Sequence, residues 1–375
     1  MLKHLVLEKY LDRWSHKIGS RATKMWFVDC FSGPWKSRHQ LLKDTSIEIG
    51  LGVLTAAQQT WEKVGRPYEL GAVFVEKDPR AFAELERHLH LHYAESSIDI
   101  RPICGSFGDH VGEIDKILRD DPAFIFVDPT GFKGAAMGFI RPLLVPRMRD
   151  VLVNVMYDHA NRFQVALQEH LLPFFGLTEG EIQGLSEDDL FALYRRQLKA
   201  HCALAYAADL RIPHATRERT WFGLVVGGKD KAVLEVFRDV EHRVMGEQAG
   251  HARDEARRAA HAQRTGGHQL GIFSAASESV PMPDDGFAKQ NADDRARLRA
   301  QLLAALPSSG WRRWQAIWPR LLEEHHVTLT QLNEIAAQAA KDGLILIDPW
   351  GPRRRRLHDG DRVRRRPSLD PNPGA

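Results

Sequence analysis

Five short apolar runs, the first three of them followed by helix-like segments, constrain the fold of the N-terminal part of this chain most strongly. The runs are rich in β-branched and aromatic residues and cover residues 25–29, 70–76, 98–103, 123–127 and 151–156. The intervening segments 47–61, 80–93 and 111–118 have lengths and patterns typical of helices. Strands that alternate with such helices predict an α/β fold with a parallel, doubly wound sheet.

Three of these predicted strands end in an acidic residue, namely Asp29, Glu76 and Asp128. Ligands of parallel sheets bind at the carboxyl ends of the strands, and Glu76 comes where a ribose-binding carboxylate falls in dinucleotide-binding folds. The sequence Asp-Pro-Thr-Gly at 128–131 is the strongest functional signal, because proline stops the strand and leaves the carboxylate at the rim, able to accept a hydrogen bond from an amino group. An ordinary strand-ending turn is the alternative.

A basic loop separates the first strand from its helix. The helix is predicted to begin at Thr45-x-x-Glu48, which has the form of a capping box. The loop before it contains Trp35, Lys36 and Arg38 and is long for a strand–helix connection, which favours a functional loop. A tolerated surface insertion is the alternative.

The chain resembles a bacterial family, the three-Cys-motif partner proteins (TcmP). The resemblance covers about the first 240 residues and rests on Asp-Cys-Phe-Ser-Gly-Pro at 29–34, Glu76, Phe-Val-Asp-Pro-Thr-Gly-Phe at 126–132 and Asn-Arg-Phe at 161–163. It implies a methyltransferase-like Rossmann domain that binds S-adenosylmethionine (SAM), commonly followed by a winged helix. It also implies association with a separate protein whose three clustered cysteines suggest an iron–sulfur or radical-SAM-like site.

The resemblance assigns cofactor binding to residues at the ends of the first three strands: Asp29, Phe31, Gly33, Glu76, Ser106 and Phe107. The first three would border the methionine part of SAM. The carboxylate of Glu76 would accept hydrogen bonds from both ribose hydroxyls, and the last two residues would flank the adenine. Trp35 departs from the usual Gly-x-Gly pattern, and its indole would crowd the methionine tail, cover it, or mark a cofactor site that has decayed.

Catalysis would depend on Asp128, Pro129, Gly131 and Phe132. Closely related motifs occur in tRNA guanine-N2 methyltransferases and in amino-directed DNA enzymes, so the resemblance implies transfer to an exocyclic amine. Methyl transfer from a sulfonium is an in-line displacement helped mainly by positioning, and a carboxylate beside a backbone carbonyl can aim an amino group. Phe132 would stack on the base, with a place in the core as the alternative.

The cysteine count and the distribution of apolar residues limit the classes of metal-binding, secreted and membrane protein to which the chain could belong. The three cysteines, at 30, 104 and 202, are too scattered for a disulfide framework or a metal cluster, so we expect no metal site and expect this chain to be the partner of the three-Cys protein. No stretch reaches the roughly 18 apolar residues that span a bilayer. Charges interrupt the amphipathic N-terminus every few residues, which argues against a signal peptide. We therefore expect a cytoplasmic protein without a membrane partner.

The predicted organisation is a methyltransferase-like domain at 1–245 with a helical insertion at 165–210, a linker at 246–293, a winged-helix-like domain at 294–358 and a basic disordered tail at 359–375. In the third region, helices are predicted at 294–305, 311–325 and 330–342 and a strand at 343–348.

Arginines accumulate near the C-terminus. Between residues 353 and 366, eight arginines face two aspartates in a chain whose net charge is only +3. Such a concentration favours a nucleic-acid partner, DNA or RNA, with a solubilising tail as the alternative. The predicted contacts are Arg353, Arg354, Arg355, Arg356, Arg364 and Arg365.

The leading hypothesis is a SAM-dependent methyltransferase that modifies an amino group of nucleic acid. The alternative is a catalytically weak partner that binds the three-Cys-motif protein and presents nucleic acid to it. A plain transcription factor is a third reading, which leaves the large α/β domain without a role.

Overall fold

The structure is a computed structural model that describes residues 2–33, 45–66, 68–132, 134–146, 148–156, 168–177, 182, 184–213, 220–247, 286–351, 354 and 356–366. The chain divides into two compact units, Met1–Phe237 (unit 1) and Arg238–Ala375 (unit 2). The division falls inside a helix at 232–247. Trp35 and most of the basic loop lie outside the described residues.

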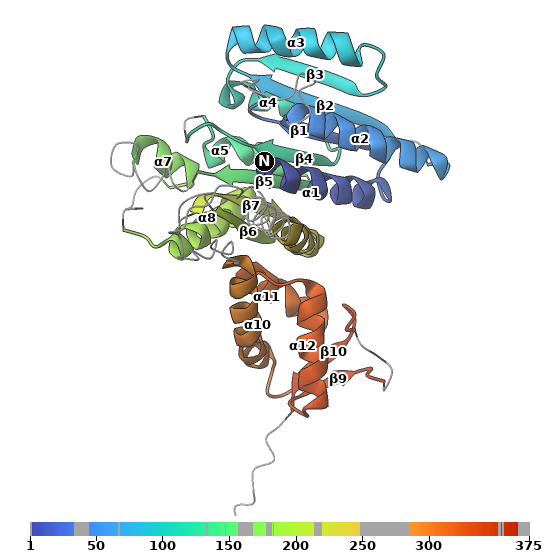
Figure 1. Cartoon of the computed structure of the whole chain (residues 1–375), viewed down its shortest axis with the longest axis vertical. Coiled ribbons are helices and arrows are strands. Elements are labelled where there is room, and N and C mark those ends of the chain that lie inside the picture. Colours follow the sequence, from blue (N-terminus) through green and yellow to red (C-terminus); the bar gives the residue numbers. More distant parts are fainter. Residues whose placement is uncertain are drawn as a thin grey trace, which may run out of the picture. The chain divides into compact units, whose positions relative to one another are not determined.

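Unit 1 is built on a seven-stranded sheet of order β3-β2-β1-β4-β5-β7-β6 (Figure 1). Neighbouring strands from β3 to β5 pair in parallel, while β7 is antiparallel to both β5 and β6. The order 3-2-1-4-5 is that of a doubly wound, Rossmann-like sheet, so this prediction is confirmed. The strands are β1 (Lys24–Asp29), β2 (Glu69–Glu76), β3 (Asp99–Cys104), β4 (Ala123–Val127), β5 (Arg149–Val155), β6 (Tyr206–Pro213) and β7 (Thr220–Gly228).

Helices cover both faces of the sheet (Figure 1). One face packs against α1 (Leu2–Gly19), α2 (Ser46–Lys63), α3 (Pro79–Tyr93) and the first part of the helix at 232–247. The other packs against α4 (Phe107–Leu118), α5 (Met137–Ile140), the 3₁₀ turn η1 (Pro142–Leu144), α7 (Gln168–Phe174) and α8 (Glu187–Cys202). Because side chains alternate along a strand, Phe27 and Phe124 face α1 and α2, whereas Val28 and Ile125 face α4.

The predicted helical insertion at 165–210 is helical only in part. Helices α7 and α8 lie within it, but residues 206–210 begin β6, an edge strand that pairs with β7. Tertiary pairing outweighs the weak strand preference of Ala207, Ala208 and Asp209.

Helix α2 begins where the sequence predicts. Thr45 is the N-cap, and its side chain accepts a hydrogen bond from the backbone N–H of Glu48 at 3.3 Å. The carboxylate of Glu48 contacts α3 instead of returning to the cap: its Oε1 lies 2.7 Å from His88 Nε2 and accepts from the Tyr93 hydroxyl at 3.0 Å. The residue that would complete a capping box thus holds α2 against α3.

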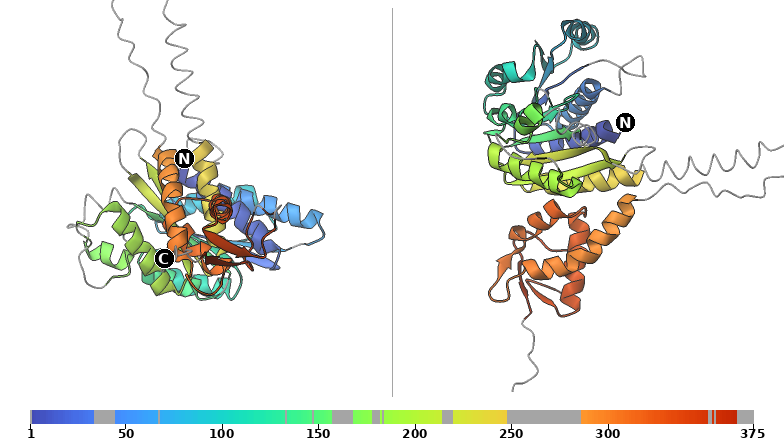
Figure 2. Two further views of the ribbon diagram at one scale, coloured as in Figure 1. Left: turned by 90° about the horizontal axis from the view of Figure 1, so that it is seen from below. Right: turned by 90° about the vertical axis from the view of Figure 1, so that its left-hand side faces the viewer.

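Besides the end of the helix at 232–247, the described part of unit 2 has the helices α10, α11 and α12 beside a small antiparallel sheet of order β8-β10-β9 (Figure 2). Its elements are α10 (Gly286–Ala305), β8 (Arg312–Arg313), the 3₁₀ turn η2 (Trp314–Ala316), α11 (Trp318–Glu324), α12 (Leu329–Lys341), β9 (Ile345–Asp348) and β10 (Arg362–Arg365).

Three local predictions in this unit need correction. The segment 311–325, predicted as one helix, contains β8, η2 and α11. The predicted linker ends too late, because α10 begins at Gly286. The predicted disordered tail contains β10, since Val363 is fully buried and the strand pairs with β9. Residues 248–285 and 367–375 lie outside the described residues.

A buried ionic network lies within unit 2. The guanidinium of Arg238 donates to Glu241 Oε2 at 2.6 Å and to the carbonyl of Leu322 at 2.9 Å. His326 Nδ1 lies 2.6 Å from Glu241 Oε1. Burial favours the neutral carboxyl, but the charges of Arg238 and His326 outweigh it and hold the pKa of Glu241 at about 2. The network therefore ties residues 238–241 to the end of α11.

Candidate functional site

The strand register brings the predicted acidic residues to one edge and one face of the sheet. Asp29 is level with Phe74 in β2 and Phe126 in β4. Glu76 and Asp128 each come two residues later, and side chains two residues apart lie on the same face. Both carboxylates therefore extend beyond Asp29 on the face that α1 and α2 cover. This is the carboxyl edge, where doubly wound sheets bind ligands.

Asp29 is fully buried and serves the protein's own backbone. Its Oδ1 accepts from the Phe31 N–H at 3.1 Å, and its Oδ2 accepts from the Ser46 hydroxyl at 2.6 Å. Burial, reinforced by the nearby charge of Asp128, raises the pKa of Asp29 to about 6 despite these hydrogen bonds. Both oxygens have partners within the chain, so Asp29 shapes the loop after β1 and the start of α2.

Glu76 and Gly33 form a close pair beside this loop. Glu76 is 8% exposed, and its Oε1 accepts from the backbone N–H of Asp78 at 2.6 Å. A Cβ atom on residue 33 would come within 1.8 Å of Glu76 Oε2, so only glycine leaves this carboxylate where it is. Ser32 fixes the backbone before it, since its N–H donates to the Val75 carbonyl at 2.8 Å.

Asp128 stands in a polar cluster with Lys3 and Asn154. Lys3 Nζ, from α1, donates to Asp128 Oδ2 at 2.5 Å. Asn154 Nδ2, from the end of β5, donates to Oδ1 at 2.7 Å. Asn154 is 5% exposed, and in the described part of the chain no donor reaches its Oδ1. Pro129 is buried after the strand, and a Cβ on Gly131 would meet open space.

The predicted aromatic residues lie mainly in the core. Phe107 is 2% exposed and packs on Phe31, with ring centroids 5.8 Å apart. Ser106 begins α4, and its hydroxyl donates to Asp109 at 2.6 Å. Phe132 is 4% exposed and packs edge-on against Phe174 at 5.1 Å, the core position considered as its alternative.

Sequence reasoning missed two members of the site, Lys3 and Asn154. Asn154 had a detectable signal, because it is the one polar side chain in the apolar run at 151–156. A buried amide in such a run needs hydrogen-bond partners. Lys3 had no comparable signal, because a lysine on an amphipathic helix usually faces solvent.

The predicted nucleic-acid contacts occupy different environments in unit 2. Arg354 makes two hydrogen bonds, at 2.9 and 2.7 Å, to the buried carboxylate of Asp361, so it closes the loop between β9 and β10. Arg356 and Arg365 are exposed, while the guanidinium of Arg364 lies 4.8 Å from the ring centroid of Trp311. Arg353 and Arg355 lie outside the described residues.

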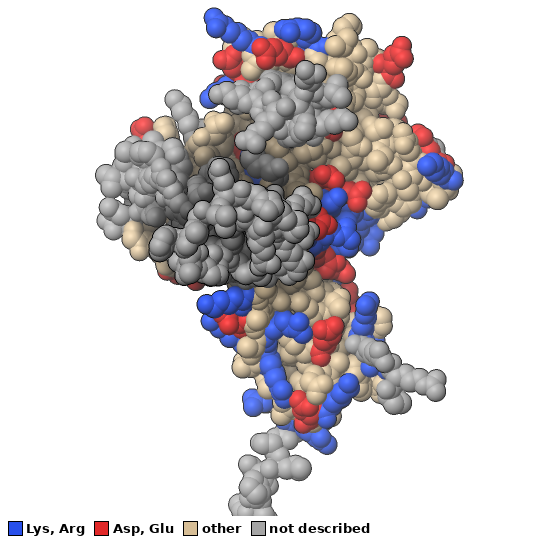
Figure 3. Space-filling view, in the orientation of Figure 1, with Lys and Arg blue, Asp and Glu red and all other residues tan. Residues whose placement is uncertain are grey.

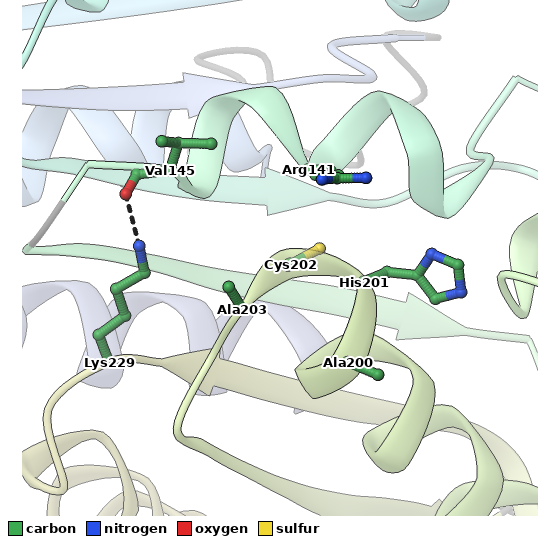
Figure 4. A pocket seen from close by; sticks show the side chains of 7 residues that line it. All are labelled: Arg141, Val145, Ala200, His201, Cys202, Ala203 and Lys229. Atoms are coloured by element: carbon green, nitrogen blue, oxygen red, sulfur yellow. Dashed lines mark hydrogen bonds between the residues drawn. The ribbon is translucent and has the colours of Figure 1, made fainter.

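Two cavities in unit 1 lie away from these strand ends. One of about 360 Å³ is lined by Arg141, Val145, Ala200, His201, Cys202, Ala203 and Lys229, and there Lys229 Nζ donates to the Val145 carbonyl (Figure 4). The other, of about 470 Å³, includes Tyr10 and Asp150 and lies at the start of β5. Neither is lined by a predicted site residue. The described residues contain no His, Cys, Asp and Glu group that could hold a metal ion, nor a helix long and apolar enough to cross a membrane.

A comparison with protein-family models finds no match, and a comparison with curated proteins finds none either. Among solved structures, the chain is similar to an O-methyltransferase from Bacillus cereus in complex with SAH, with 12% identity over 59% of this chain and 80% of that one and a TM-score of 0.32. It is also similar to the O-methyltransferase TomG from Streptomyces achromogenes in complex with SAM, with 12% identity, 60% and 79% coverage and a TM-score of 0.30.

A third similar structure, a protein from Legionella pneumophila, shares 10% identity over 60% of this chain and 84% of that one, with a TM-score of 0.35. Because each TM-score is below 0.5, we base the function on the geometry of the chain itself.

Proposed function

We propose that unit 1 is a SAM-dependent methyltransferase domain that acts on an exocyclic amino group of nucleic acid. The observation that carries this proposal is the strand register, which places Glu76 and Asp128 on one face of the carboxyl edge. One carboxylate would bind the cofactor and the other would orient the group to be methylated. This arrangement agrees with the resemblance to the three-Cys-motif partner proteins.

The residues at the ends of β1 and β2 fit a nucleoside cofactor. Gly33 lacks the Cβ that would displace the Glu76 carboxylate, and Glu76 Oε1 already has a partner in the Asp78 N–H. Its remaining lone pairs can accept from ribose hydroxyls. Asp29 would hold the loop before Gly33 in the shape that binding requires. SAM, when bound, would supply the electrophilic methyl group.

Asp128 and Asn154 would orient the amino group. The Asp128 carboxylate and the unpartnered Asn154 Oδ1 are both acceptors, and an amino group offers two N–H donors. Holding those hydrogens directs the nitrogen lone pair away from the protein and toward the methyl carbon. The amino nitrogen would take up the methyl group that SAM supplies and would give up one proton, which the carboxylate of Asp128 would accept.

Unit 2 would hold the polymer. We interpret its element order, α10-β8-α11-α12-β9-β10, and its sheet order, β8-β10-β9, as a winged helix in which the connection between β9 and β10 would be the wing. Basic side chains on this unit supply the charge that phosphate contacts need.

The test is transfer of labelled methyl groups from SAM to DNA or RNA by the full chain, compared with Asp128→Ala. We expect the variant to lose activity by about a hundredfold or more, because orientation of the nucleophile provides much of the rate. Its SAM affinity should stay near that of the intact chain, and circular dichroism should show a folded protein, although loss of the Lys3 ion pair lowers its melting temperature. Equal activity of the two proteins would refute the assignment of Asp128.

One observation favours a second candidate, a catalytically weak partner of a three-Cys-motif protein. Lys3 Nζ donates to Asp128 at 2.5 Å and so takes the place that a substrate amine would occupy. In such a partner, the ion pair would be a permanent structural contact, and nucleic acid would be presented to the other protein. Co-purification with a three-Cys-motif protein, without SAM binding by this chain, would support this candidate over the enzyme.

A further inference from the structure

The sheet of unit 2 carries an aromatic side chain among arginines on its outward face. Val363 is fully buried, so its neighbours Arg362 and Arg364 point to the opposite face. Arg313 is paired directly with Arg362, which places it on the outward face as well. Trp311, two residues before Arg313, continues the same face next to Arg364. Its ring centroid lies 5.7 Å from Arg362 Cζ and 4.8 Å from Arg364 Cζ. We call Trp311, Arg313, Arg362 and Arg364 the strand face.

Positive charge on and around the strand face is poorly compensated. Within the described residues, carboxylates pair with five arginines of this unit outside the helix at 232–247, namely Arg295, Arg299, Arg320, Arg354 and Arg362. No such pair is found there for Arg312, Arg313, Arg364 or Arg365, and Arg364 Nε has no hydrogen-bond partner. Arg362 lies between Arg313 and Asp348 in the strand register, and its guanidinium pairs with Asp348. An anionic partner would therefore meet the uncompensated charges of Arg313 and Arg364.

Trp311 gives the strand face a second property. The residue is 40% exposed, although large aromatic residues are usually buried. Arginines that follow a phosphate backbone, together with an exposed ring on which a base can stack, are the features of proteins that bind single strands. Figure 3 shows blue side chains at several places on the visible surface of unit 2, with fewer red ones among them.

Helix α12, the counterpart of a recognition helix, lacks this character. Its exposed residues are Thr330, Glu334, Gln338 and Lys341, and Glu334 lies 3.6 Å from Arg295. A helix that reads duplex DNA lies in the major groove with its side chains on base edges and near phosphates. One cation on this surface, together with an acidic residue, makes it a poor match for that groove.

We propose that the strand face binds single-stranded nucleic acid, with a base stacked on Trp311 and phosphates held by Arg313 and Arg364. This inference rests on the proposed role of nucleic acid as the substrate of unit 1. It adds that the substrate arrives as a single strand, in which exocyclic amines are accessible without base pairs being opened.

The test is fluorescence anisotropy of the full chain with fluorescein-labelled oligonucleotides of about twenty nucleotides: single-stranded DNA, single-stranded RNA and the matching DNA duplex. We expect the single strands to bind more tightly than the duplex, and the stronger of the two identifies the natural polymer. Trp311→Ala should weaken single-strand binding about tenfold, whereas Trp311→Phe retains a ring and should stay near the intact chain. Arg364→Gln should lower the slope of log affinity against log salt by about 0.7.

Lys341→Gln on α12 is the matched control and should leave single-strand binding nearly unchanged. The proposal would be overturned if the duplex bound as tightly as the single strands, and if that binding was lost in Lys341→Gln but kept in Trp311→Ala. Failure of every probe to bind would overturn it as well. A SAM titration of the same preparation shows whether the cofactor site works, so that a failure to bind nucleic acid can be told from a failure to bind SAM. Circular dichroism confirms that each variant is folded.

Discussion

Gly33 has the simplest physical role of any residue in the candidate site. It leaves room for the carboxylate of Glu76, whose Oε2 would lie 1.8 Å from a Cβ atom at position 33. The atom that would have to move is the end of a flexible side chain. A larger residue would therefore disturb the site far more than it disturbs the fold.

Gly33→Ala should thus lose SAM binding by about tenfold or more while its thermal unfolding stays within a few degrees of the intact chain, since displaced Glu76 loses its charged hydrogen bonds. Gly52→Ala on the exposed side of α2 is the matched control, because no atom of the described residues lies within 4 Å of its added Cβ. Isothermal titration of both variants checks this. Equal SAM affinity in the two would show that Gly33 is not needed.

Asp150 makes stability depend on pH. Burial, with a smaller contribution from Asp230, raises its pKa to about 7, although the Tyr10 hydroxyl donates to it at 3.0 Å and Lys17 lies nearby. Because the folded pKa exceeds the unfolded one, the stabilisation is complete below about pH 4 and is lost as pH rises to about 7.

Asp150→Asn should remove this dependence. The free energy of unfolding of the variant, relative to the intact chain, should be higher at pH 8 than at pH 5 by about 2–3 kcal/mol. Urea titrations at the two pH values measure the difference. If the free energies of unfolding of the two proteins differed by the same amount at both pH values, the raised pKa of Asp150 would be contradicted.

At the scale of elements, prediction succeeded where local pattern and tertiary structure agree. The parallel strands are apolar runs with sharp ends: β1 and β2 end in the predicted acidic residues, and Asp128 directly follows the last residue of β4. Strand β6 was missed because Tyr206–Pro213 contains two alanines and a buried Asp209, and only pairing with β7 makes it a strand. The site was incomplete for the same reason, since Lys3 reaches Asp128 only through the packing of α1.

Asp209 holds this edge of the sheet together. Its carboxylate is 3.0 Å from Arg195 of α8 and 3.5 Å from Arg211 of β6, and the residue is 3% exposed. Asp209→Ala should lower the free energy of unfolding by about 3 kcal/mol, because it leaves the half-buried guanidinium groups of Arg195 and Arg211 without that buried partner.

Asp188→Ala is the control for this prediction. Asp188 pairs with the same Arg211 at 2.5 Å, but its side chain is 81% exposed, so the loss should stay below about 1 kcal/mol. Urea unfolding measures both variants. Similar losses would show that burial of Asp209 adds nothing.

At the scale of the whole molecule, the chain combines a Rossmann-like unit with a small basic unit. The first offers carboxylates at the sheet edge where ligands bind, and the second offers arginines beside an exposed tryptophan. Sequence patterns predicted this division because each unit has its own periodicity and its own charge. They could not show which arginines are paired, since Arg354 and Arg364 look alike in sequence and differ only in their neighbours.

The central claim is that the carboxyl edge of unit 1 binds SAM through Glu76. Calorimetric titration of the full chain with SAM, beside Glu76→Ala and Glu69→Ala, tests it most directly, because Glu69 lies at the other end of the same strand. We predict saturable binding by the intact chain and by Glu69→Ala, and at least about tenfold weaker binding by Glu76→Ala, as expected for the loss of charged hydrogen bonds. No binding by the intact chain, or equal binding by all three proteins, would contradict the claim.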